Sequence, residues 1–512
     1  MPTDGLGVGR RSRSSPSARE ARTWRRRPAS QQGGCWNAGR PRVNTRDPES
    51  VLYWAERRVL EIQTKLHRWA TGDPHRRFDD VFNLVADPAF LLVAWDRVRS
   101  NKGSRTAEAD GTTARYIETA IGVEGFLDQL RCQLKQRNFH PVPVRERMIP
   151  KANGKMRRLG IPTTADRVVQ ASLKLVLEPI FEAEFHPCSY GFRPGRRAQD
   201  AIAETWFLAK HSYEWVVEGD IEACFDMIDH TALMDRVRRR VGDKRVLDLV
   251  KAFLKAGILS QDRQFRNTET GTPQGGILSP LLANIALSIL DEYFAQVEGG
   301  PATREWERRK RRLRGQASYR LIRYADDFLV MVSGDREHAE QARDVVAAVL
   351  APMGLRLSET KTMITHIDEG LDFLGWRIQR HRKRGTNRRH IYTYPAKKAL
   401  KAVMAKVKTI CRQNINEPLA TLLRQLNPVL RGWSTYFRAG VSASTFQYLS
   451  KYAWERAMGW IRRKHRKITW KQLRRRFCGG GWWPVDGQSY LFDPGRMRII
   501  RYRYRGTKIL TP

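Results

Sequence analysis

The stretch LIRYADDFLVMV, residues 321–332, joins two apolar segments through a tip that carries two adjacent carboxylates. It predicts a β-hairpin, because apolar residues fill both strands and polar residues occupy the turn. Two neighbouring aspartates repel each other and resist burial unless a cation joins them. A rigid pair of acids at a strand end is what a Mg²⁺-dependent phosphoryl-transfer site needs. Acidic dipeptides are also common in ordinary turns, so the run alone is compatible with a solvated hairpin.

A second acidic segment supports the metal-site interpretation. Trp215–Val217 has the pattern of a short buried strand, and Asp220 lies where that strand ends, so it can face the hairpin tip across a sheet. Side chains alternate along a strand, so Asp326 and Asp327 are expected to point in different directions. We therefore predict Asp220 and Asp326 as direct ligands of two Mg²⁺ ions, with Asp327 as a partial or outer ligand. Catalysis at such a site is mostly positioning and charge neutralisation.

The composition indicates a nucleic-acid partner. The 512 residues include 93 Lys and Arg against 53 Asp and Glu, a formal charge of +40. This excess predicts salt-sensitive binding to phosphates, although an Arg-rich codon bias would also contribute. The length suggests about three domains. Six cysteines are scattered singly, which argues against a zinc ribbon or a disulfide scaffold and favours a reducing compartment. No apolar run reaches the roughly eighteen residues of a membrane span.

The chain changes character along its length. Residues 1–50 predict a disordered basic arm, although their Arg- and Ser-rich composition also resembles an organellar transit peptide and an over-long start is a further possibility. Residues Val51 to Phe139 have helical apolar spacing with a break near 101–113. Residues 140–380 mix strands and helices, and helices rich in Arg and Trp follow Pro395. Short basic strands are expected over 490–509, and Arg304–Arg314 is expected to be an exposed insertion or RNA-facing loop.

Two further segments have the character of substrate contacts. Gly271–Pro280 is a Gly- and Pro-rich loop before an apolar helix at Leu281–Leu290, and Gln274 in it offers both a donor and an acceptor. Ile149–Leu159 predicts a basic hairpin with its turn at Asn153-Gly154, which could close over a triphosphate.

Taken in order, these segments resemble the polymerase domain of reverse transcriptases, most closely the proteins encoded by group II introns. The resemblance covers residues 80–475, and the full ordered set is far more specific than any single motif. Its segments are the basic hairpin, Ser189–Pro194, the Asp220 strand, Pro273–Gly275, the Tyr324–Asp327 tip, Gly354–Thr362 and Phe373–Trp376.

The resemblance implies an α+β right-hand polymerase, with fingers, an antiparallel palm sheet and a helical thumb that is also the maturase, or X, domain. The expected divisions are a basic tail (1–50), an N-terminal fingers extension (51–139), fingers and palm (140–380), thumb (395–478) and a basic C-terminal segment (479–512).

It also implies RNA-templated DNA synthesis from a primer 3′-hydroxyl, with two Mg²⁺ ions and the carboxylate triad Asp220, Asp326 and Asp327. Phe225 would exclude a 2′-hydroxyl, although a core phenylalanine is the alternative. The segment Phe373, Leu374, Gly375 and Trp376 would hold the primer end, and ordinary helix and strand packing is the alternative for this segment and for Lys361. The remaining nucleotide contacts implied are Lys151 and Arg157 on the triphosphate, Gln274 on the incoming nucleotide and Lys361 on the departing pyrophosphate.

RNA contacts are implied in two further regions. Asn101–Ser104 and Asp110-Gly111 resemble a template-contacting fingers segment, in which Ala109 replaces a usual glycine; in the basic hairpin, Arg158 likewise replaces a usual proline. Leu426–Phe437 resembles the maturase segment, whose basic and aromatic side chains suit phosphate contact and stacking. The RNA-binding residues expected there and in the cationic cluster Trp454–Phe477 are Arg431, Trp433, Arg462, Arg463 and Lys464.

The implied partners are a group II intron RNA, an RNA template, a DNA primer or target and dNTPs, with no membrane and with the oligomeric state open. A bacterial cytoplasmic location is expected, with association to the nucleoid or an organellar location as alternatives. No HNH endonuclease with paired cysteines is expected, so mobility would need a primer from elsewhere. A non-catalytic RNA-binding splicing factor and a reverse transcriptase recruited to phage defence remain alternative functions.

Overall fold

The computed structural model describes residues 47–506 and 509, except residues 102, 104–108, 151–153, 155, 261–264, 267, 384 and 414. The chain divides into two units, Met1–Pro48 and Glu49–Pro512. The basic arm predicted for residues 1–50 lies almost wholly outside the described residues. Within those residues, no helix is long and apolar enough to cross a membrane.

The hairpin predicted at 321–332 forms half of a four-stranded antiparallel sheet with strand order β6–β7–β3–β8. Its two strands pair from Ser318 with Ser333 to Tyr324 with Asp327, so that Ala325 and Asp326 form the turn. The strand predicted at Trp215–Val217 lies beside it and ends at Asp220, as expected. The bounds are β3 Trp215–Asp220, β6 Ser318–Tyr324, β7 Asp327–Ser333 and β8 Met363–His366.

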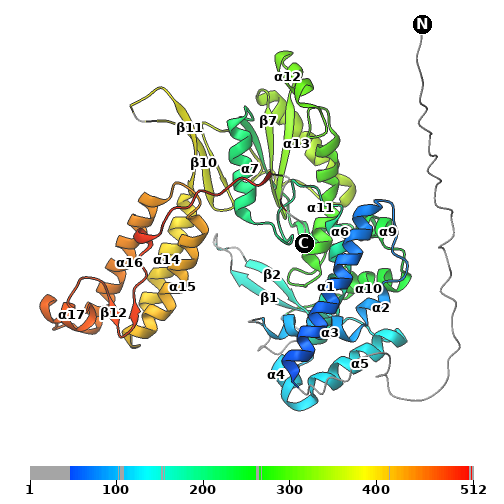
Figure 1. The fold of residues 1–512 in the computed structure, drawn as a ribbon, viewed down its shortest axis with the longest axis horizontal. Helices are drawn as coiled ribbons and strands as arrows, with labels where there is room; N and C mark the ends of the chain where they lie inside the picture. The colour runs from blue at the N-terminus through cyan, green and yellow to red at the C-terminus, as the bar shows by residue number, and fades with distance from the viewer. Residues whose placement is uncertain are drawn as a thin grey trace, which may run out of the picture. The chain divides into compact units, whose positions relative to one another are not determined.

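Helices cover both faces of this sheet (Figure 1). Val217 and Val330 join one core cluster with residues of α11 and α13, whereas Val216 and Leu329 join another with residues of α7. Burial on both faces explains why β7 is a continuous apolar run instead of an alternating one. The predicted helix at Leu281–Leu290 is confirmed as part of a longer one. The bounds are α7 Ala198–Lys210, α11 Ser279–Gln296 and α13 Arg336–Leu350.

The fingers contain the basic hairpin, whose strands β1 and β2 pair from Arg145 with Ile161 to Pro150 with Met156. The sheet order there is β2–β1–β4–β5. Lys151 and Asn153 lie outside the described residues, so the predicted turn and triphosphate contact of Lys151 are not seen. The bounds are β1 Val144–Pro150, β2 Met156–Ile161, β4 Ile258–Leu259 and β5 Phe265–Arg266.

The predicted helical character of the N-terminal extension is confirmed. Its helices pack on α6 through buried apolar residues such as Val85, Leu91 and Leu173. The bounds of the helices in the extension are α1 Pro48–Gly72, α2 Phe82–Val85, α3 Pro88–Arg99, α4 Ala114–Tyr116, the π-helix Ile117–Ile121 and α5 Val123–Gln136. The helices that follow the extension are α6 Thr164–Glu182, α8 Cys224–Met227, α9 His230–Arg240 and α10 Lys244–Lys255.

The helical thumb is also confirmed, and its buried residues form a core of their own that includes Val407, Leu426 and Trp460. A three-stranded sheet in the order β11–β10–β9 precedes it. The bounds are β9 Leu371–Phe373, β10 Trp376–Arg382, β11 Arg389–Pro395, α14 Lys397–Gln413, α15 Leu419–Phe437, α16 Ala443–Lys464 and α17 Trp470–Phe477.

The exposed insertion predicted at Arg304–Arg314 is a helix, α12 Glu305–Leu313, and the loop prediction was wrong. None of its residues is buried, in agreement with the predicted exposure. Glu305 and Glu307 lie in its first turn and Lys310, Arg311 and Arg312 in its last, which suits the helix dipole.

The basic strands predicted over 490–509 were also wrong. After the short pair β12 Val485–Asp486 and β13 Ser489–Tyr490, no described residue of this segment belongs to a strand. Instead, the Tyr502 hydroxyl and the Arg505 guanidinium bond Asp200 at 2.6–2.8 Å, and the Tyr504 ring stacks on Phe207 at 4.5 Å. An extended segment can lie against a helix, here α7, without pairing as a strand.

Gly219 gives a test of how the hairpin packs on β3. A Cβ added there would lie 2.0 Å from Cζ of Phe328, its cross-strand partner. Gly219→Ala should therefore lower the free energy of unfolding by about 1–3 kcal/mol through overpacking, measured by urea denaturation. Gly432→Ala in α15 is the matched control, because nothing lies within 4 Å of its added Cβ and the helix should gain up to about 1 kcal/mol. Equal effects of the two changes would contradict this packing.

Candidate active site

Strand pairing brings the three predicted carboxylates to one end of the palm sheet. Asp220 is the last residue of β3 and Asp327 the first of β7, and the two are direct cross-strand partners. Such partners have Cα atoms about 4.5–5.5 Å apart and side chains on the same face. Asp326 occupies the turn, after Ala325 with its left-handed φ of 59°. The predicted convergence is thus present, whereas the division of ligand roles between Asp326 and Asp327 stays a prediction.

The three acids interact electrostatically. Loss of hydration, followed by repulsion from the carboxylates of Asp326 and Asp220, raises the pKa of Asp327 to about 6. The Lys361 ammonium partly offsets this effect, and its Nζ lies 2.6 Å from Asp220 Oδ2. Carboxylate oxygens whose negative charge is only partly relieved match the preference of Mg²⁺.

Within the described part of the chain, no three His, Cys, Asp or Glu side chains already stand at metal-ligand spacing. The donor chemistry fits the cation, but a cation would have to draw the carboxylates closer and share Asp220 with Lys361.

A polar chain connects the fingers to the palm beside these acids. Arg157 Nε on β2 donates to Gln274 Oε1 at 2.8 Å, and Gln274 Nε2 donates to Asp226 Oδ2 at 3.3 Å. The backbone reinforces the link, since Gly160 N donates to Gln274 O at 2.7 Å. Two residues predicted to contact the nucleotide, 117 positions apart, are therefore in direct contact.

Phe225 lies in α8, directly before Asp226, and only 8% of it is exposed. Its backbone oxygen accepts a bond from Thr272 N at 2.6 Å, which holds the Gly271–Pro280 loop against α8. Gly271 is required here, because its φ is +82° and an added Cβ would lie 2.6 Å from the Asp226 backbone. Phe225 therefore lies beside the Gly271–Pro280 loop, which is expected to contact the nucleotide. Its role in excluding a 2′-hydroxyl stays a prediction.

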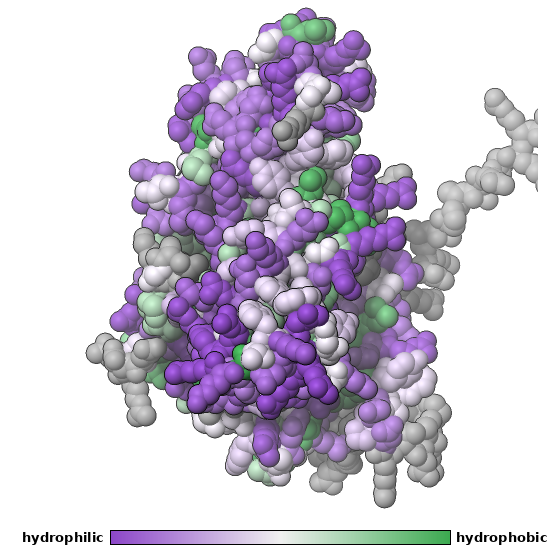
Figure 2. Space-filling view, turned by 90° about the vertical axis from the view of Figure 1, so that its left-hand side faces the viewer, coloured by the Kyte–Doolittle hydropathy of each residue, from purple (hydrophilic) through white to green (hydrophobic). Residues whose placement is uncertain are grey.

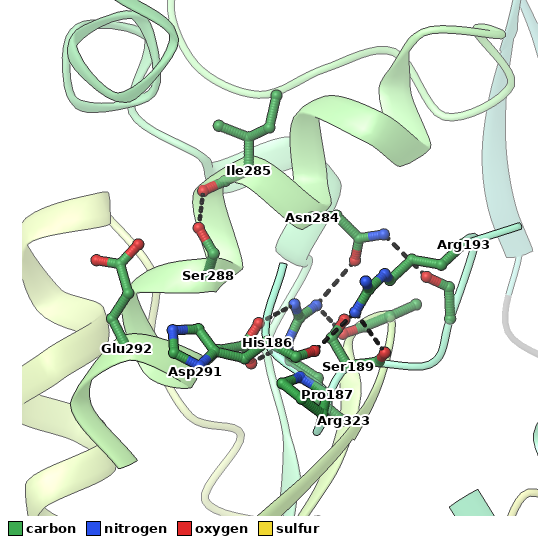
Figure 3. A network of polar contacts seen from close by, with 12 residues as sticks. His186, Pro187, Ser189, Arg193, Asn284, Ile285, Ser288, Asp291, Glu292 and Arg323 are labelled. Atoms are coloured by element: carbon green, nitrogen blue, oxygen red, sulfur yellow. Dashed lines mark hydrogen bonds and ion pairs between the residues drawn. The ribbon is translucent and has the colours of Figure 1, made fainter. Parts of the chain in front are cut away.

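A buried network behind the hairpin was not found from the sequence (Figure 3). Arg323 is fully buried in β6, and its Nε donates to Asp291 Oδ1 at 2.7 Å. Its Nη1 donates to Asn284 Oδ1 at 2.9 Å and to the carbonyl of Ala325 in the turn at 3.2 Å. The guanidinium thereby ties the acidic turn to α11. Asn284 and Asp291, seven residues apart on an apolar helix and thus on one face, were the available sequence signal.

The Ser189–Pro194 segment supports the same turn. A Cβ on Gly191 would lie 2.3 Å from Ala325 N, so only glycine lets the two backbones approach this closely. Asn284 Nδ2 donates to Gly191 O at 2.8 Å (Figure 3). Arg193 is buried and pairs with Glu182, while its Nη1 donates to Ser189 O at 2.9 Å. This motif therefore positions the hairpin.

The predicted primer segment forms the tight turn between β9 and β10. Leu374 and Gly375 have φ values of 49° and 80°, as in a type I′ turn. Phe373 and Trp376 are 5% and 1% exposed, and the Trp376 ring lies 4.8 Å from the ring of Phe437 in the thumb. Only the Leu374-Gly375 tip can reach a primer in this conformation. Contact with a primer stays a prediction.

The predicted RNA-binding residues of the thumb fall into two groups. Arg431 and Arg462 are exposed and lie over the rings of Phe492 and Trp470. The others make internal contacts, although Arg463 is also exposed: Trp433 packs on Phe437, Arg463 donates to Cys411 O and Lys464 Nζ donates to Glu417 O at 2.6 Å. Figure 2 views the side on which the C-terminal helices lie in Figure 1, and hydrophilic residues dominate it.

Two family models match the chain. Residues 149–378 match the reverse transcriptase (RNA-dependent DNA polymerase) family, and residues 400–479 match the group II intron, maturase-specific domain. The first includes the three acids, the hairpin and the Gly271–Pro280 loop, and the second covers most of α14–α17.

Curated relatives of the chain include two whose names refer to introns. Protein YkfC of Escherichia coli is 37% identical over 359 residues, which is 67% of this chain and 93% of the relative. The group II intron-encoded protein LtrA of Lactococcus lactis is 33% identical over 61% of this chain and 58% of its own length. Nuclear intron maturase 1, mitochondrial, of Arabidopsis thaliana is 28% identical over 44% and 42%. The chain thus spans nearly all of the first relative and less than two thirds of the other two.

The buried network gives a stability prediction. Asp291→Ala would leave the Arg323 guanidinium buried without its counter-charge and should cost about 3–5 kcal/mol of unfolding free energy, measured by urea denaturation. The control is Glu340→Ala, which removes an exposed pair with Arg336 on α13 and should cost less than about 1 kcal/mol. A loss below 1 kcal/mol for Asp291→Ala would show that the pair does not hold the hairpin.

The raised pKa of Asp327 gives a pH prediction. Its folded-state pKa of about 6 lies above the usual aspartate value, so the metal-free protein should lose stability as pH rises through that value. A divalent cation relieves the repulsion only when Asp327 is ionised, so Mg²⁺ should raise the melting temperature more at pH 7.5 than at pH 5. Asp327→Asn should remove this difference, and Asp248→Asn, at an exposed position on α10, should preserve it. An equal gain at both pH values would refute it.

Proposed function

Because the chain belongs to the group II intron branch of the reverse transcriptases, we propose that it copies RNA into DNA at the carboxylate cluster Asp220, Asp326 and Asp327. A reverse transcriptase is an RNA-dependent DNA polymerase, so the chain is a nucleotidyltransferase. The observation that carries the site assignment is the direct cross-strand pairing of Asp220 with Asp327, next to an acidic turn.

Two Mg²⁺ ions on these carboxylates would activate the primer 3′-hydroxyl and neutralise charge on the departing pyrophosphate. The chain's own residues supply orientation. Arg157 contacts Gln274, which is expected to touch the incoming nucleotide. Charge-assisted bonds from Arg157 to the triphosphate would then hold the fingers hairpin against the nucleotide. Lys361, whose Nζ lies 2.6 Å from Asp220 Oδ2, is close enough to serve the pyrophosphate beside a cation that shares that carboxylate. Phe225 would limit the space beside the sugar.

The second proposed role is that of a maturase, in which the thumb binds the host intron RNA and assists splicing and mobility. The maturase-specific match over residues 400–479 supports it, as do the exposed Arg431 and Arg462 on that domain. DNA target, dNTPs and a bacterial or organellar compartment remain parts of this proposal. Two of the named relatives come from bacteria, and the third, from Arabidopsis thaliana, is named as mitochondrial.

Primer extension tests the site assignment. Asp326→Asn should reduce incorporation of dTTP on a poly(rA)–oligo(dT) substrate by more than about a hundredfold, because a group that stabilises transition-state charge is worth about 10²–10³ in rate. Asp248→Asn should retain wild-type incorporation. Full activity of Asp326→Asn would remove Asp326 from the metal site.

The same variant separates the two roles. If RNA binding by the thumb promotes splicing independently of polymerisation, Asp326→Asn should still accelerate splicing of the intron RNA. A parallel loss of both activities would argue against a separate maturase surface.

A further inference from the structure

The ribbon formed by β10 and β11 has no role in the site described above. Its strands pair over seven residue pairs, from Trp376 with Pro395 to Arg382 with Arg389. The reverse transcriptase match ends at residue 378 and the maturase match begins at 400, so nearly all of the ribbon belongs to neither. Figure 1 shows its distal end extending beyond α7.

One face of the ribbon holds it on the palm. Ile378 is fully buried, and Trp206 Nε1 on α7 donates to Ile391 O at 3.0 Å. Arg380, two residues after Ile378, pairs with Glu214 and with Asp368. Because side chains alternate along a strand, the intervening residues point away from the palm.

That outer face carries a row of rings. The His381 ring centroid lies 6.0 Å from those of Tyr392 and Tyr394, and the His390 and Tyr392 centroids are 6.3 Å apart. The His381 Nε2 and the Tyr394 hydroxyl are within 3.2 Å, and that hydroxyl donates to Gln379 Oε1 at 3.0 Å. None of the five side chains is buried. Bonds to neighbours orient the rings, and His381 and His390 are exposed while Tyr392 and Tyr394 are half-buried.

The distal end of the ribbon is cationic. No Asp or Glu occurs between Trp376 and Pro395. The acids near its base are already paired: Asp372 with Arg377, and Asp368 with both Arg380 and Arg389. Lys383 and Arg388 at the distal end are exposed and form no ion pair with another described residue, whereas Arg382, on the palm side of the strand, donates to Thr386 O at 3.1 Å and to Asn387 Oδ1.

We propose that the outer face of this ribbon binds single-stranded nucleic acid. Bases would stack on the His381, Tyr392 and His390 rings, and the distal cations would hold the neighbouring phosphates. A single strand is required, because paired bases in a duplex do not present their faces to protein rings. The proposal relies on the proposed function only for the class of ligand, since it needs no catalysis.

Tyr392 tests the stacking. We would measure binding of the full chain to fluorescent 20-nucleotide oligo(rU) and oligo(dT) by anisotropy, without dNTPs. Tyr392→Leu keeps apolar bulk but removes the ring and should weaken binding about tenfold, within the range for one base–aromatic stack. Tyr392→Phe keeps the ring and should bind as the wild type. Loss with one oligonucleotide alone assigns the surface to RNA or to DNA. Equal affinity of both variants, or an equal loss on a 20-base-pair duplex, would overturn the proposal.

The cations are tested by salt dependence. Each phosphate contact on a single strand contributes about 0.7 to the slope of log K against log salt concentration, so replacing Lys383 and Arg388 together by Gln should lower that slope by about 1.4. The matched control replaces Lys251 and Lys255 by Gln on α10, where both are also exposed and the same charge is lost. An equal change in slope for both double variants would show non-specific attraction and overturn the assignment.

These assays separate two kinds of failure. A wild-type chain that binds oligonucleotides through the ribbon but extends no primer would overturn the proposed function and leave this surface standing. A chain that extends primers while Tyr392→Leu binds normally would overturn the ribbon proposal alone.

Discussion

The buried ion pair between Arg323 and Asp291 is the interaction on which the acidic hairpin depends. Three carboxylates at one strand end repel each other, and this repulsion adds to the loss of hydration that raises the pKa of Asp327. The turn is nevertheless held in place, because Arg323 donates to the carbonyl of Ala325 in the turn and to the side chains of Asn284 and Asp291 in α11. A buried guanidinium is costly unless it is fully paired, so this arrangement tolerates little change. The bonds of Arg323 thus offset part of the free-energy cost of placing three like charges together.

The sheet provides the rigidity that this arrangement needs. Alternate residues of β3 and β7 enter two different cores, so neither strand can shift register without exposing apolar side chains on both faces. One of those cores also includes Trp376, Phe437 and Ile509, which come from the segment before the thumb, the thumb and the C-terminal segment. Strand alternation places Asp220 and Asp327 on the sheet face that packs in this core. The palm therefore contacts later parts of the chain on the same face as these two acids.

Charge alone is a poor guide to the nucleic-acid surface of this protein. Arg463 and Lys464 belong to its densest cationic cluster, yet both donate to backbone carbonyls that join thumb helices. Arg474 likewise bonds the carbonyls of Gly480 and Gly481. By contrast, Lys383 and Arg388 at the distal end of the β10–β11 ribbon have no acidic partner among the described residues, whereas Arg382 there donates to Thr386 O and Asn387 Oδ1. Which cations are available to phosphates follows from their contacts and not from their number.

The sequence by itself determined the acidic hairpin, the strand that ends at Asp220, the mixed palm and the helical thumb, because these follow from local apolar periodicity and turn residues. The order of its motifs also indicated the family that the comparisons confirmed. It misassigned α12 and the C-terminal segment, where charged or alternating residues fit more than one backbone conformation.

Only the tertiary structure decided that Asp327 lies opposite Asp220, that Arg157 contacts Gln274 and that Arg323 supports the turn. Each of these contacts joins segments whose positions depend on strand register or helix packing. A local pattern predicts the backbone conformation of a residue and which face of its helix or strand is buried. It does not determine which distant side chain packs against that face.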